Sequence, residues 1–335
     1  YRSTGAGAAL PCPDYLVQHH EMPTSQAHLR RLAALVPPLL SAACILAITC
    51  VYLGGTDWLF GRPVVFDGDG VFFYVYANTV SDTGWNQFAP KLGAPFGFPL
   101  IAYPSVLTFD TMLMNVLSLR TDDPISLLNR AWAANLCICG VLSYLAFRLL
   151  HLKRTSSVVL SILFALIPYA FYRNVGHYNL VFSTIAPPLA ATLLVATGEI
   201  EEKRRIHFIL LCASFAIVGF GYIYYAFFLA FALLCGTAVR FFEHPSLRVL
   251  TRSAILFSAL IASVLLNLAP SLISWNSDGR PENMDYKNVQ EADIFGLRIR
   301  DLIVPDARSH VPLLREAGVR NSEVPWPDQN ERTTA

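Results

Sequence analysis

The sequence predicts an all-α polytopic membrane protein with about seven transmembrane helices, a large first extracytoplasmic loop containing interfacial helices, and a polar C-terminal tail. Of the 335 residues, 54% are hydrophobic and only 15% are charged, which is too apolar for an ordinary soluble domain. The apolar residues form runs that are long enough to cross the hydrocarbon core as helices. When seven spans are counted, the basic loops between them fall on one side, as the positive-inside rule expects.

The first span is predicted at residues 32–55, in the run "LAALVPPLLSAACILAITCVYLGG". The basic residues His28, Arg30 and Arg31 precede it and favour a cytoplasmic start. The run lies too far from the N-terminus to be a cleaved signal peptide. Residues 1–31 are mixed and polar, so we expect a disordered cytoplasmic segment. Because the chain begins at Tyr1 rather than Met, we expect it to be part of a longer protein.

Residues 55–124 form the predicted first outer loop, and a structured loop of this length is usually functional. Its aromatic residues, glycines and prolines suit a cap that packs on the helix ends at the membrane surface. Within it, residues 100–119 are apolar enough for an eighth span. That count would reverse the charge pattern of the later loops and would place Asp110 in lipid, which is costly. We therefore expect a helix that lies in the outer interface.

Further spans are predicted at residues 126–150, 156–172, 178–196 and 252–275. Residues 206–239 are long for one span, and the break at Gly219–Tyr222 predicts two short helices, because glycine weakens a helix interior. The loops expected on the cytoplasmic side carry Lys153 and Arg154, then Lys203, Arg204 and Arg205, then Arg240 and Arg248. The transmembrane domain is thus predicted at residues 32–275. Residues 276–335 follow as an extracytoplasmic tail, which we expect to be truncated.

Composition also excludes several kinds of partner and site. A net charge of +1, with lysines and arginines scattered among apolar blocks, argues against a nucleic-acid partner. Six of the seven cysteines lie in apolar runs, where a thiol behaves as a small hydrophobe. Cys137 and Cys139 point to different faces of a helix, so they make a poor metal pair. Neither a disulfide framework nor a cysteine metal site is predicted.

The first candidate site lies in "DGDG", residues 67–70, where Asp67 and Asp69 precede an aromatic run. One interpretation is a solvated turn in which Asp69 caps a helix that begins near Val71. The other is a general base, or a pair of metal-binding carboxylates, at the membrane surface. A lone D-x-D pattern leaves both open.

The second candidate is "PYAFYRNVGHYNL", residues 168–180. A helix is expected to end at Arg173, and His177 opens the next one, so both side chains can converge on one anionic group. Arginine binds phosphate through two hydrogen bonds, and a histidine at a helix N-terminus can assist. Lys91, in the first outer loop, is a third cation for the same role. The alternative is that these side chains reach out to the lipid headgroups.

Together these segments resemble the GT-C superfamily of polytopic glycosyltransferases, in particular a bacterial membrane group, over residues 32–275. The matching residues are Gly68-Asp69, Phe72 to Tyr76, Gly84, Pro90, "LGAPFG" at 92–97, Tyr103-Pro104, Asp110, Asn129 or Asn135, "PYAFYR" at 168–173 and Gly176-His177. The linked set is characteristic of the group, whereas each motif alone is not.

The resemblance implies an enzyme that moves a sugar from a polyprenyl-phosphate carrier to a lipid, glycan or protein acceptor. It implies a multi-pass protein of the bacterial inner membrane, in the cell envelope, with membrane lipids around it and the active site outside. Asp69 takes the place of the essential acidic residue, with Asp67 as the second carboxylate. Many members use Mg or Mn, so Asp67 and Asp69 could instead be metal ligands; no other cofactor is expected. Arg173, His177 and Lys91 would bind the lipid phosphate.

Two other classes remain open. A transporter or flippase of lipid-linked sugars would also have broken helices and outer aromatics, but it should carry more ionisable residues at the depth of the membrane midplane. A noncatalytic scaffold would have no site that joins Asp69 to Arg173. Which sugar and which acceptor are used depends on the shape of a pocket, which the sequence does not give.

Overall fold

The computed structural model describes residues 24–66, 68–93, 95–102, 107–181, 183–281 and 311–322. Within these ranges the secondary structure is helical, and one antiparallel bridge, between Ala89 and Phe98, stands in place of a sheet. The all-α prediction is therefore confirmed for this part of the chain.

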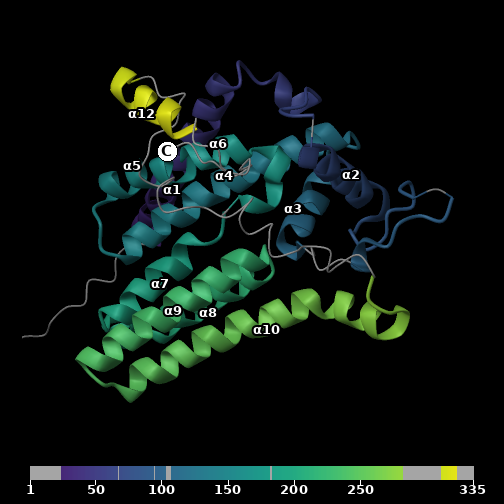
Figure 1. Cartoon of the computed structure of the whole chain (residues 1–335). Helices are drawn as coiled ribbons and strands as arrows, with labels where there is room; N and C mark the ends of the chain where they lie inside the picture. The colour runs from purple at the N-terminus through teal and green to yellow at the C-terminus, as the bar shows by residue number, and fades with distance from the viewer. Residues whose placement is uncertain are drawn as a thin grey trace, which may run out of the picture. The chain divides into compact units, whose positions relative to one another are not determined.

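The structure contains long apolar helices joined by short helical turns (Figure 1). The α-helices are α1 (Thr24–Tyr52), α2 (Gly68–Thr83), α3 (Thr108–Ser118), α4 (Pro124–Leu149), α5 (Arg154–Ala165), α6 (Pro168–Arg173), α7 (Ala186–Ala196), α8 (Arg205–Gly219), α9 (Ile223–Glu243), α10 (Leu247–Asp278) and α12 (Pro312–Ser322). Short 3-10 helices are η1 (Asp57–Phe60), η2 (Leu100–Ala102), η3 (Val175–Leu180) and η4 (Glu199–Glu202).

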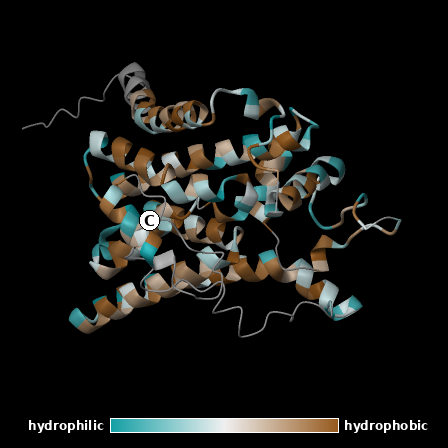
Figure 2. Cartoon of the chain, turned by 45° about the horizontal axis from the view of Figure 1, so that its top comes forward, coloured by the Kyte–Doolittle hydropathy of each residue, from teal (hydrophilic) through white to brown (hydrophobic). Residues whose placement is uncertain are grey.

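Five stretches are helical, long and apolar enough to cross a membrane: Leu32–Tyr52, Pro124–Leu149, Arg154–Arg173, Ile223–Glu243 and Leu247–Asp278. Two shorter apolar helices, α7 and α8, overlap parts of the other two predicted spans. In Figure 2, hydrophobic residues recur along most of the helices, and many of them are exposed. Leu39 and Phe231, for example, are 62% and 63% exposed. Such exposed apolar residues are expected of helices that contact lipid, so the chain has the character of a membrane protein.

The chain divides into two compact units, and the border falls inside α10. One unit contains residues 1–98 and 105–267, and the other contains residues 99–104 and 268–335. In the second unit, the indole of Trp275 donates a 2.7 Å hydrogen bond to the carbonyl oxygen of Ala102. This bond ties η2 to the end of α10. All candidate site residues belong to the first unit.

The first unit has two hydrophobic clusters. The larger surrounds α4, which packs against α1, α2, α3, α5 and α7. Trp58 and Trp132 are fully buried in it, with their rings 5.8 Å apart in an edge-to-face arrangement. The second cluster joins α7, α8, α9 and the first half of α10 through residues such as Phe215 and Leu229. Close contact among these large side chains favours the association of the helices through van der Waals packing, since lipid provides no hydrophobic driving force between them.

Two sequence predictions need correction. The predicted span 178–196 is an α-helix only from Ala186, because Pro187 and Pro188 occupy its first turn, where proline is tolerated and where it begins helices. The residues before them form η3, which carries part of the candidate site. At the N-terminus, α1 begins at Thr24, inside the segment 1–31 that was expected to be disordered. Residues 1–23 lie outside the described part of the chain.

The predicted break in residues 206–239 is present between α8 and α9. Asn267 of α10 holds it, because its amide donates to the carbonyl oxygens of Gly219 and Gly221 at 3.2 and 3.3 Å. The amide oxygen of Asn267 accepts a 2.7 Å bond from Thr108, at the start of α3. The backbone N–H of Phe109 also donates to the carbonyl oxygen of Phe220 at 3.0 Å. The break therefore anchors α3, which carries Asp110.

Gly219 allows α8 to approach α10 closely, and we expect Gly219→Ala to destabilise the protein. A Cβ atom there would clash with Ser263 and would lie 2.8 Å from the carbonyl oxygen of Leu260, which is backbone and cannot move aside. Overpacking of this kind costs about 1–3 kcal/mol. The matched control is Gly221→Ala, whose nearest neighbour would lie 3.4 Å away. Thermal unfolding in detergent should show a lower midpoint for Gly219→Ala alone, and equal midpoints would contradict the prediction.

Candidate functional site

The first turn of α2 lies against η3 because glycines stand at the point of contact. A Cβ atom at Gly70 would lie 3.6 Å from the Cα atom of Gly176 and 3.1 Å from the side chain of Val65. A Cβ atom at Gly176 would lie 3.3 Å from the same side chain. A larger residue at either position would have to push Val65 aside. The close approach places Asp69, next to Gly70, beside His177, next to Gly176.

A strained residue turns the chain between α6 and η3. Asn174 has a φ angle of +38°, which is rare for residues other than glycine. Its side chain stabilises the turn by accepting a 2.9 Å hydrogen bond from the backbone N–H of Gly176. Backbone strain of this kind is found preferentially at functional sites. Here the turn brings Arg173, the last residue of α6, to His177.

Asp69, His177 and Arg173 form one cluster, which we call the outer triad after the side of the membrane that the sequence predicts for it. The Nε2 atom of His177 lies 3.5 Å from a carboxylate oxygen of Asp69 and 3.3 Å from a guanidinium nitrogen of Arg173. The side chain of Asp69 is 69% exposed and that of His177 is 37% exposed. The guanidinium of Arg173 also lies over the rings of Tyr169 and Tyr172, at 5.7 and 5.6 Å, where cation–π attraction holds it. The triad thus combines an accessible carboxylate with two nitrogen groups.

The protonation of His177 decides how the outer triad is connected. The same Nε2 atom faces both neighbours, so it can donate a hydrogen bond to Asp69 or accept one from Arg173, but it cannot do both. When the imidazole is protonated, two positive groups stand beside one carboxylate. An anion that enters can then bind both of them and release Asp69. Chemically, the triad can accept a proton at Asp69 and bind an anion at Arg173 and His177.

Asp69 does not cap a helix that begins near Val71, as one interpretation of the sequence expected. The helix begins at Gly68, so Asp69 lies in its first turn, where the helix dipole favours a negative charge. Asp67 lies outside the described residues. Among the residues that are described, no three His, Cys, Asp or Glu side chains lie close enough to hold a metal ion. Near the triad they supply one carboxylate and one imidazole, and Mg or Mn would need more oxygen ligands, with Asp67 as the candidate.

Lys91 lies in a different place from the outer triad. Its ammonium forms an ion pair with Asp82 at 2.7 Å, and both residues line a cavity whose described lining includes none of the triad residues. The structure therefore brings together Asp69, His177 and Arg173 from the predicted set and pairs Lys91 with another carboxylate.

Beneath the outer triad lies a buried polar network around Asp110 of α3. The side-chain amide of Asn135, on α4, donates 2.9 Å hydrogen bonds to the carboxylate of Asp110 and to the hydroxyl of Tyr178. Tyr178 follows His177 on η3 and also hydrogen-bonds to Asp110. Asn135 and Tyr178 are fully buried, and Asp110 is 7% exposed. The network joins α3, α4 and η3, so it fixes the segment that carries His177.

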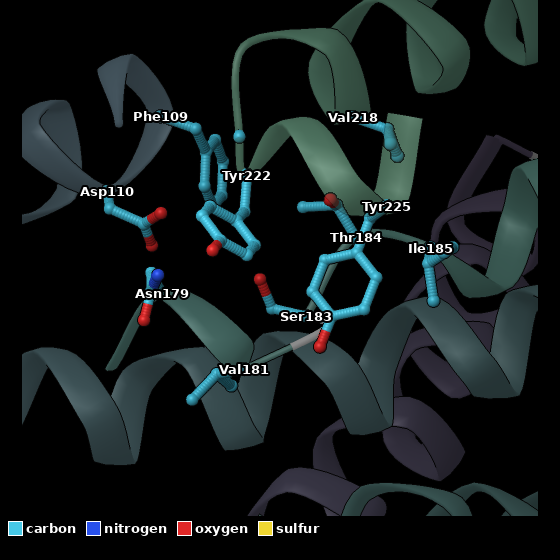
Figure 3. Close-up of a pocket in the computed structure, with 11 residues that line it drawn as sticks. Phe109, Asp110, Asn179, Val181, Ser183, Thr184, Ile185, Val218, Tyr222 and Tyr225 are labelled. Carbon is cyan, nitrogen blue, oxygen red and sulfur yellow. The ribbon is translucent and has the colours of Figure 1, made fainter. Parts of the chain in front are cut away.

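A narrow cavity of about 20 Å³ adjoins this network. Figure 3 shows the side chains of Asp110, Asn179 and Tyr222 pointing toward one another at one end of it. Ser183 and Thr184 supply further hydroxyl groups to its lining. A volume of this size holds about one water molecule, and the polar lining offers the partners that a buried water needs.

Burial raises the pKa of Asp110 to about 6, although hydrogen bonds from Asn135 and Tyr178 act in the opposite direction. The folded protein therefore binds this proton more tightly than the unfolded chain does. Protonation stabilises the fold fully below the unfolded pKa of 3.8, and this contribution is lost as the pH rises through about 6. The ionisable neighbours on the packed elements, Tyr178 and Tyr76, have pKa values that burial raises above 10.0, so they stay neutral in this range.

We expect Asp110→Asn to remove part of the pH dependence of stability. Asparagine does not titrate, and its amide oxygen can still accept the hydrogen bond from Asn135. The unfolding midpoint of the unmodified protein should fall between about pH 4 and about pH 7 by more than that of the variant. Thermal unfolding in detergent across this range measures the difference. Parallel curves for the two proteins would show that Asp110 does not titrate there.

The sequence pattern left Asn129 and Asn135 as alternatives, and the structure separates their contacts. Asn129 is buried and donates to the carbonyl oxygens of Trp58 and Arg62 at 2.6 and 2.9 Å, so it ties the segment around η1 to α4. Asn135 instead reaches Asp110. Tyr178 and Asn179 were not singled out from the sequence, although both lie in the segment "PYAFYRNVGHYNL". A polar pair directly after His177 was the signal that could have identified them.

Comparison of the chain with protein-family models, with curated proteins and with solved structures gives no match. The chemistry of the outer triad and of the network beneath it is therefore the ground for a functional assignment.

Proposed function

We propose that this protein is a membrane glycosyltransferase that moves a sugar from a polyprenyl-phosphate carrier to an acceptor hydroxyl. The outer triad is the observation that carries the proposal. It sets the imidazole of His177 within ion-pair distance of an accessible carboxylate and within hydrogen-bonding distance of a guanidinium, on a chain rich in apolar helices. Such a transfer needs a base for the acceptor and positive charge for a phosphate leaving group, and it needs both at the surface where a lipid carrier is held.

In the proposed reaction, Asp69 takes the proton from the acceptor hydroxyl as its oxygen attacks the anomeric carbon of the sugar. The bond between that carbon and the carrier phosphate breaks, and the electron pair leaves with the phosphate oxygen. Arg173 and protonated His177 stabilise the charge of the departing polyprenyl phosphate. The 3.5 Å contact between Asp69 and His177 leaves no room for a sugar, so the donor phosphate must draw His177 away from Asp69 when it binds.

The membrane arrangement that fits this reaction has seven spans, with α7 and α8 crossing together with the five longer helices. The basic residues near Lys153, Lys203 and Arg240 then face the cytoplasm, and the outer triad lies at the extracytoplasmic surface. In a bacterial cell this is the outer surface of the inner membrane. A divalent metal, Mg or Mn, would bind at Asp67 and Asp69 if the enzyme uses one, and it would supply electrophilic assistance to the phosphate.

A flippase of lipid-linked sugars is disfavoured by the distribution of charge. Among the described residues, Asp110 is the carboxylate that is buried, and its hydrogen-bond partners within the protein satisfy it. A transport pathway should instead be lined by several ionisable groups at the membrane midplane. The exposed position of Asp69 suits chemistry at a surface.

The proposal is tested by incubating membranes that contain the full-length protein with radiolabelled polyprenyl-phosphate sugars. We expect label to move from the carrier into a product that depends on the protein. Topology is tested separately with a membrane-impermeant maleimide, which should react with cysteine introduced near Asn86, at the exposed Gln87, but not near Lys153 or Lys203. Maleimide labelling at Lys153 from outside would reject the seven-span arrangement. If the radiolabelled sugar stays on every carrier, the proposed transferase activity is rejected.

A further inference from the structure

A second cavity lies along one face of α2, at the edge of the larger hydrophobic cluster. It has a volume of about 310 Å³, which is at the lower end of the range for small-molecule sites. Its lining follows one stripe of α2 at helical spacing: Val71, Tyr74, Val75, Asn78, Thr79 and Asp82. Ala89 to Leu92 close it from one side, and Pro124 and Ile125 from another. The outer triad does not contribute to this lining.

The loop that covers the cavity is built to a fixed shape. Ala89 and Phe98 exchange two backbone hydrogen bonds of 2.9 Å, so the segment between them closes as a hairpin. Gly97 has a φ angle of +78°, and a Cβ atom there would clash with the ring of Phe88. Gly93, with a φ angle of +67°, faces the carbonyl oxygen of Gly97. The motif "LGAPFG" therefore serves to hold Lys91 and Leu92 over α2.

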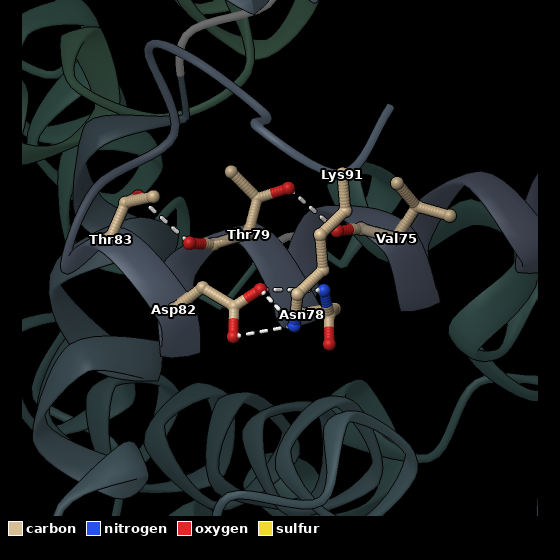
Figure 4. Close-up of polar contacts among 6 residues, drawn as sticks. All are labelled: Val75, Asn78, Thr79, Asp82, Thr83 and Lys91. Carbon is tan, nitrogen blue, oxygen red and sulfur yellow. Dashed lines mark hydrogen bonds and ion pairs between the residues drawn. The ribbon is translucent and has the colours of Figure 1, made fainter. Parts of the chain in front are cut away.

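The polar groups of the cavity form one connected set (Figure 4). The amide of Asn78 donates to Asp82 at 3.0 Å, and the ammonium of Lys91 binds the two carboxylate oxygens of Asp82 at 2.9 and 2.7 Å. The side chains of Asp82 and Lys91 are 29% and 68% exposed, so a ligand can reach them. Together the three side chains offer donors and acceptors with no net charge.

The opposite part of the lining is apolar and includes a stacking surface. Phe66 is 65% exposed, and its ring lies 5.8 Å from that of Tyr74. Both residues line the cavity, together with aliphatic groups from Val71, Val75, Leu92 and Ile125. The occupant must therefore present an apolar face to the aromatic pair and hydroxyl-type groups to the charged pair.

These features select the occupant by its chemistry. A phosphate would need a cation that is not already matched by a carboxylate, and a metal ion would need more than the single carboxylate of Asp82. A prenyl chain has no polar groups that could form hydrogen bonds with Asn78, Asp82 and Lys91. A neutral sugar ring fits, because it has C–H faces that pack on aromatic rings and hydroxyls that bond to carboxylate, amide and ammonium groups.

We infer that this cavity binds a neutral sugar ring of the acceptor, a role that rests on the proposed transferase function. The donor, which carries a phosphate, would bind at Arg173 and His177. The cavity begins at Val71, two residues along α2 from Asp69. Side chains at this spacing point to different faces of a helix, so the acceptor must extend around the first turn of α2 to bring its hydroxyl to the proposed base. Asn78, Asp82 and Lys91 act as binding residues, and the exposed ring of Phe66, which packs on the buried Tyr74, forms the platform.

The test measures occupancy at Lys91 directly and needs no turnover. The full chain in lipid nanodiscs is treated with an amine-acetylating reagent, alone and with methyl glycosides of glucose, galactose, mannose and N-acetylglucosamine, and mass spectrometry follows each lysine. At least one glycoside at a concentration well above its dissociation constant should slow acetylation of Lys91 by about threefold or more, because only the free site reacts. Sorbitol, an open-chain polyol, should not slow the acetylation of Lys91. Lys203 should react at the same rate in every sample.

Two variants make the result specific. Asn78→Ala and Asp82→Asn should each abolish protection by the glycoside, whereas Ser81→Ala, on the same helix but outside the cavity lining, should retain it. An unchanged rate at Lys203 shows that the reagent acts equally on each variant, and an unchanged unfolding midpoint shows that the variant is folded. The inference would be overturned if none of the glycosides protects Lys91, or if sorbitol protects it equally well. It would also be overturned if a sugar-free prenyl phosphate is the one compound that protects Lys91. Since no transfer is measured, these outcomes are independent of whether the protein is a transferase.

Discussion

Asp69→Asn is expected to lower sugar transfer by about 100-fold or more, which is the usual scale for the loss of a general base. The substitution keeps the size of the side chain but removes its charge and its ability to take a proton. The side chain is 69% exposed and lies in the first turn of α2, so a purely structural role predicts a loss of only about 0.3–1 kcal/mol of stability. Initial rates with radiolabelled carrier, together with carrier binding and the unfolding midpoint, separate the two roles.

The comparison variant is Arg173→Lys, which keeps the positive charge but replaces a planar fork of donors by a point charge. We expect it to weaken carrier binding and to change the maximal rate less than Asp69→Asn does, because arginine is proposed to hold the phosphate. If Asp69→Asn instead weakens carrier binding and keeps a normal maximal rate, Asp69 rather than Arg173 contributes to holding the carrier. If Asp69→Asn transfers sugar at the normal rate, Asp69 is not the base, and its role is to stabilise the first turn of α2.

The sequence predicted the helical class and the positions of most long helices, because apolar runs and glycine breaks depend on local composition. The sequence prediction was wrong for the first part of the span 178–196. The apolar run begins there, but the α-helix begins only at Ala186. The proline pair at 187–188 marks the true start of α7, and the preceding segment follows tertiary contacts to α2 and α3 instead. Hydropathy measures the environment of a segment, and it does not report whether its backbone is helical.

For the candidate site, the sequence identified Asp69, Arg173 and His177 as chemically suitable but could not show that they meet. Their meeting depends on the glycine contact between Gly70 and Gly176, which is a property of two segments about a hundred residues apart. Lys91 illustrates the opposite case. Its residue type suited a phosphate site, but the hairpin that carries it folds over Asp82. Which carboxylate a lysine pairs with is set by tertiary structure.

Asn135→Leu is expected to destabilise the protein strongly, because it removes the amide that donates to Asp110 and Tyr178. Leucine has a similar volume but leaves a buried carboxylate with one partner fewer. The loss should be about 3 kcal/mol at neutral pH, within the range for stranding a buried polar or charged group. It should shrink as the pH falls below the raised pKa of Asp110, about 6, since a protonated carboxyl group costs less to bury.

A double-mutant cycle isolates this interaction. In the Asp110→Asn background, where no charge can be stranded, Asn135→Leu should cost less than in the unmodified protein, with a coupling free energy of about 1–2 kcal/mol. The matched control is Asn129→Leu on the same helix, which is equally buried but bonds to the carbonyl oxygens of Trp58 and Arg62. Its cost should be independent of both the Asp110 background and pH. If Asn135→Leu behaves in the same way as Asn129→Leu, Asp110 is not held by Asn135, and the segment that carries His177 must be fixed by other contacts.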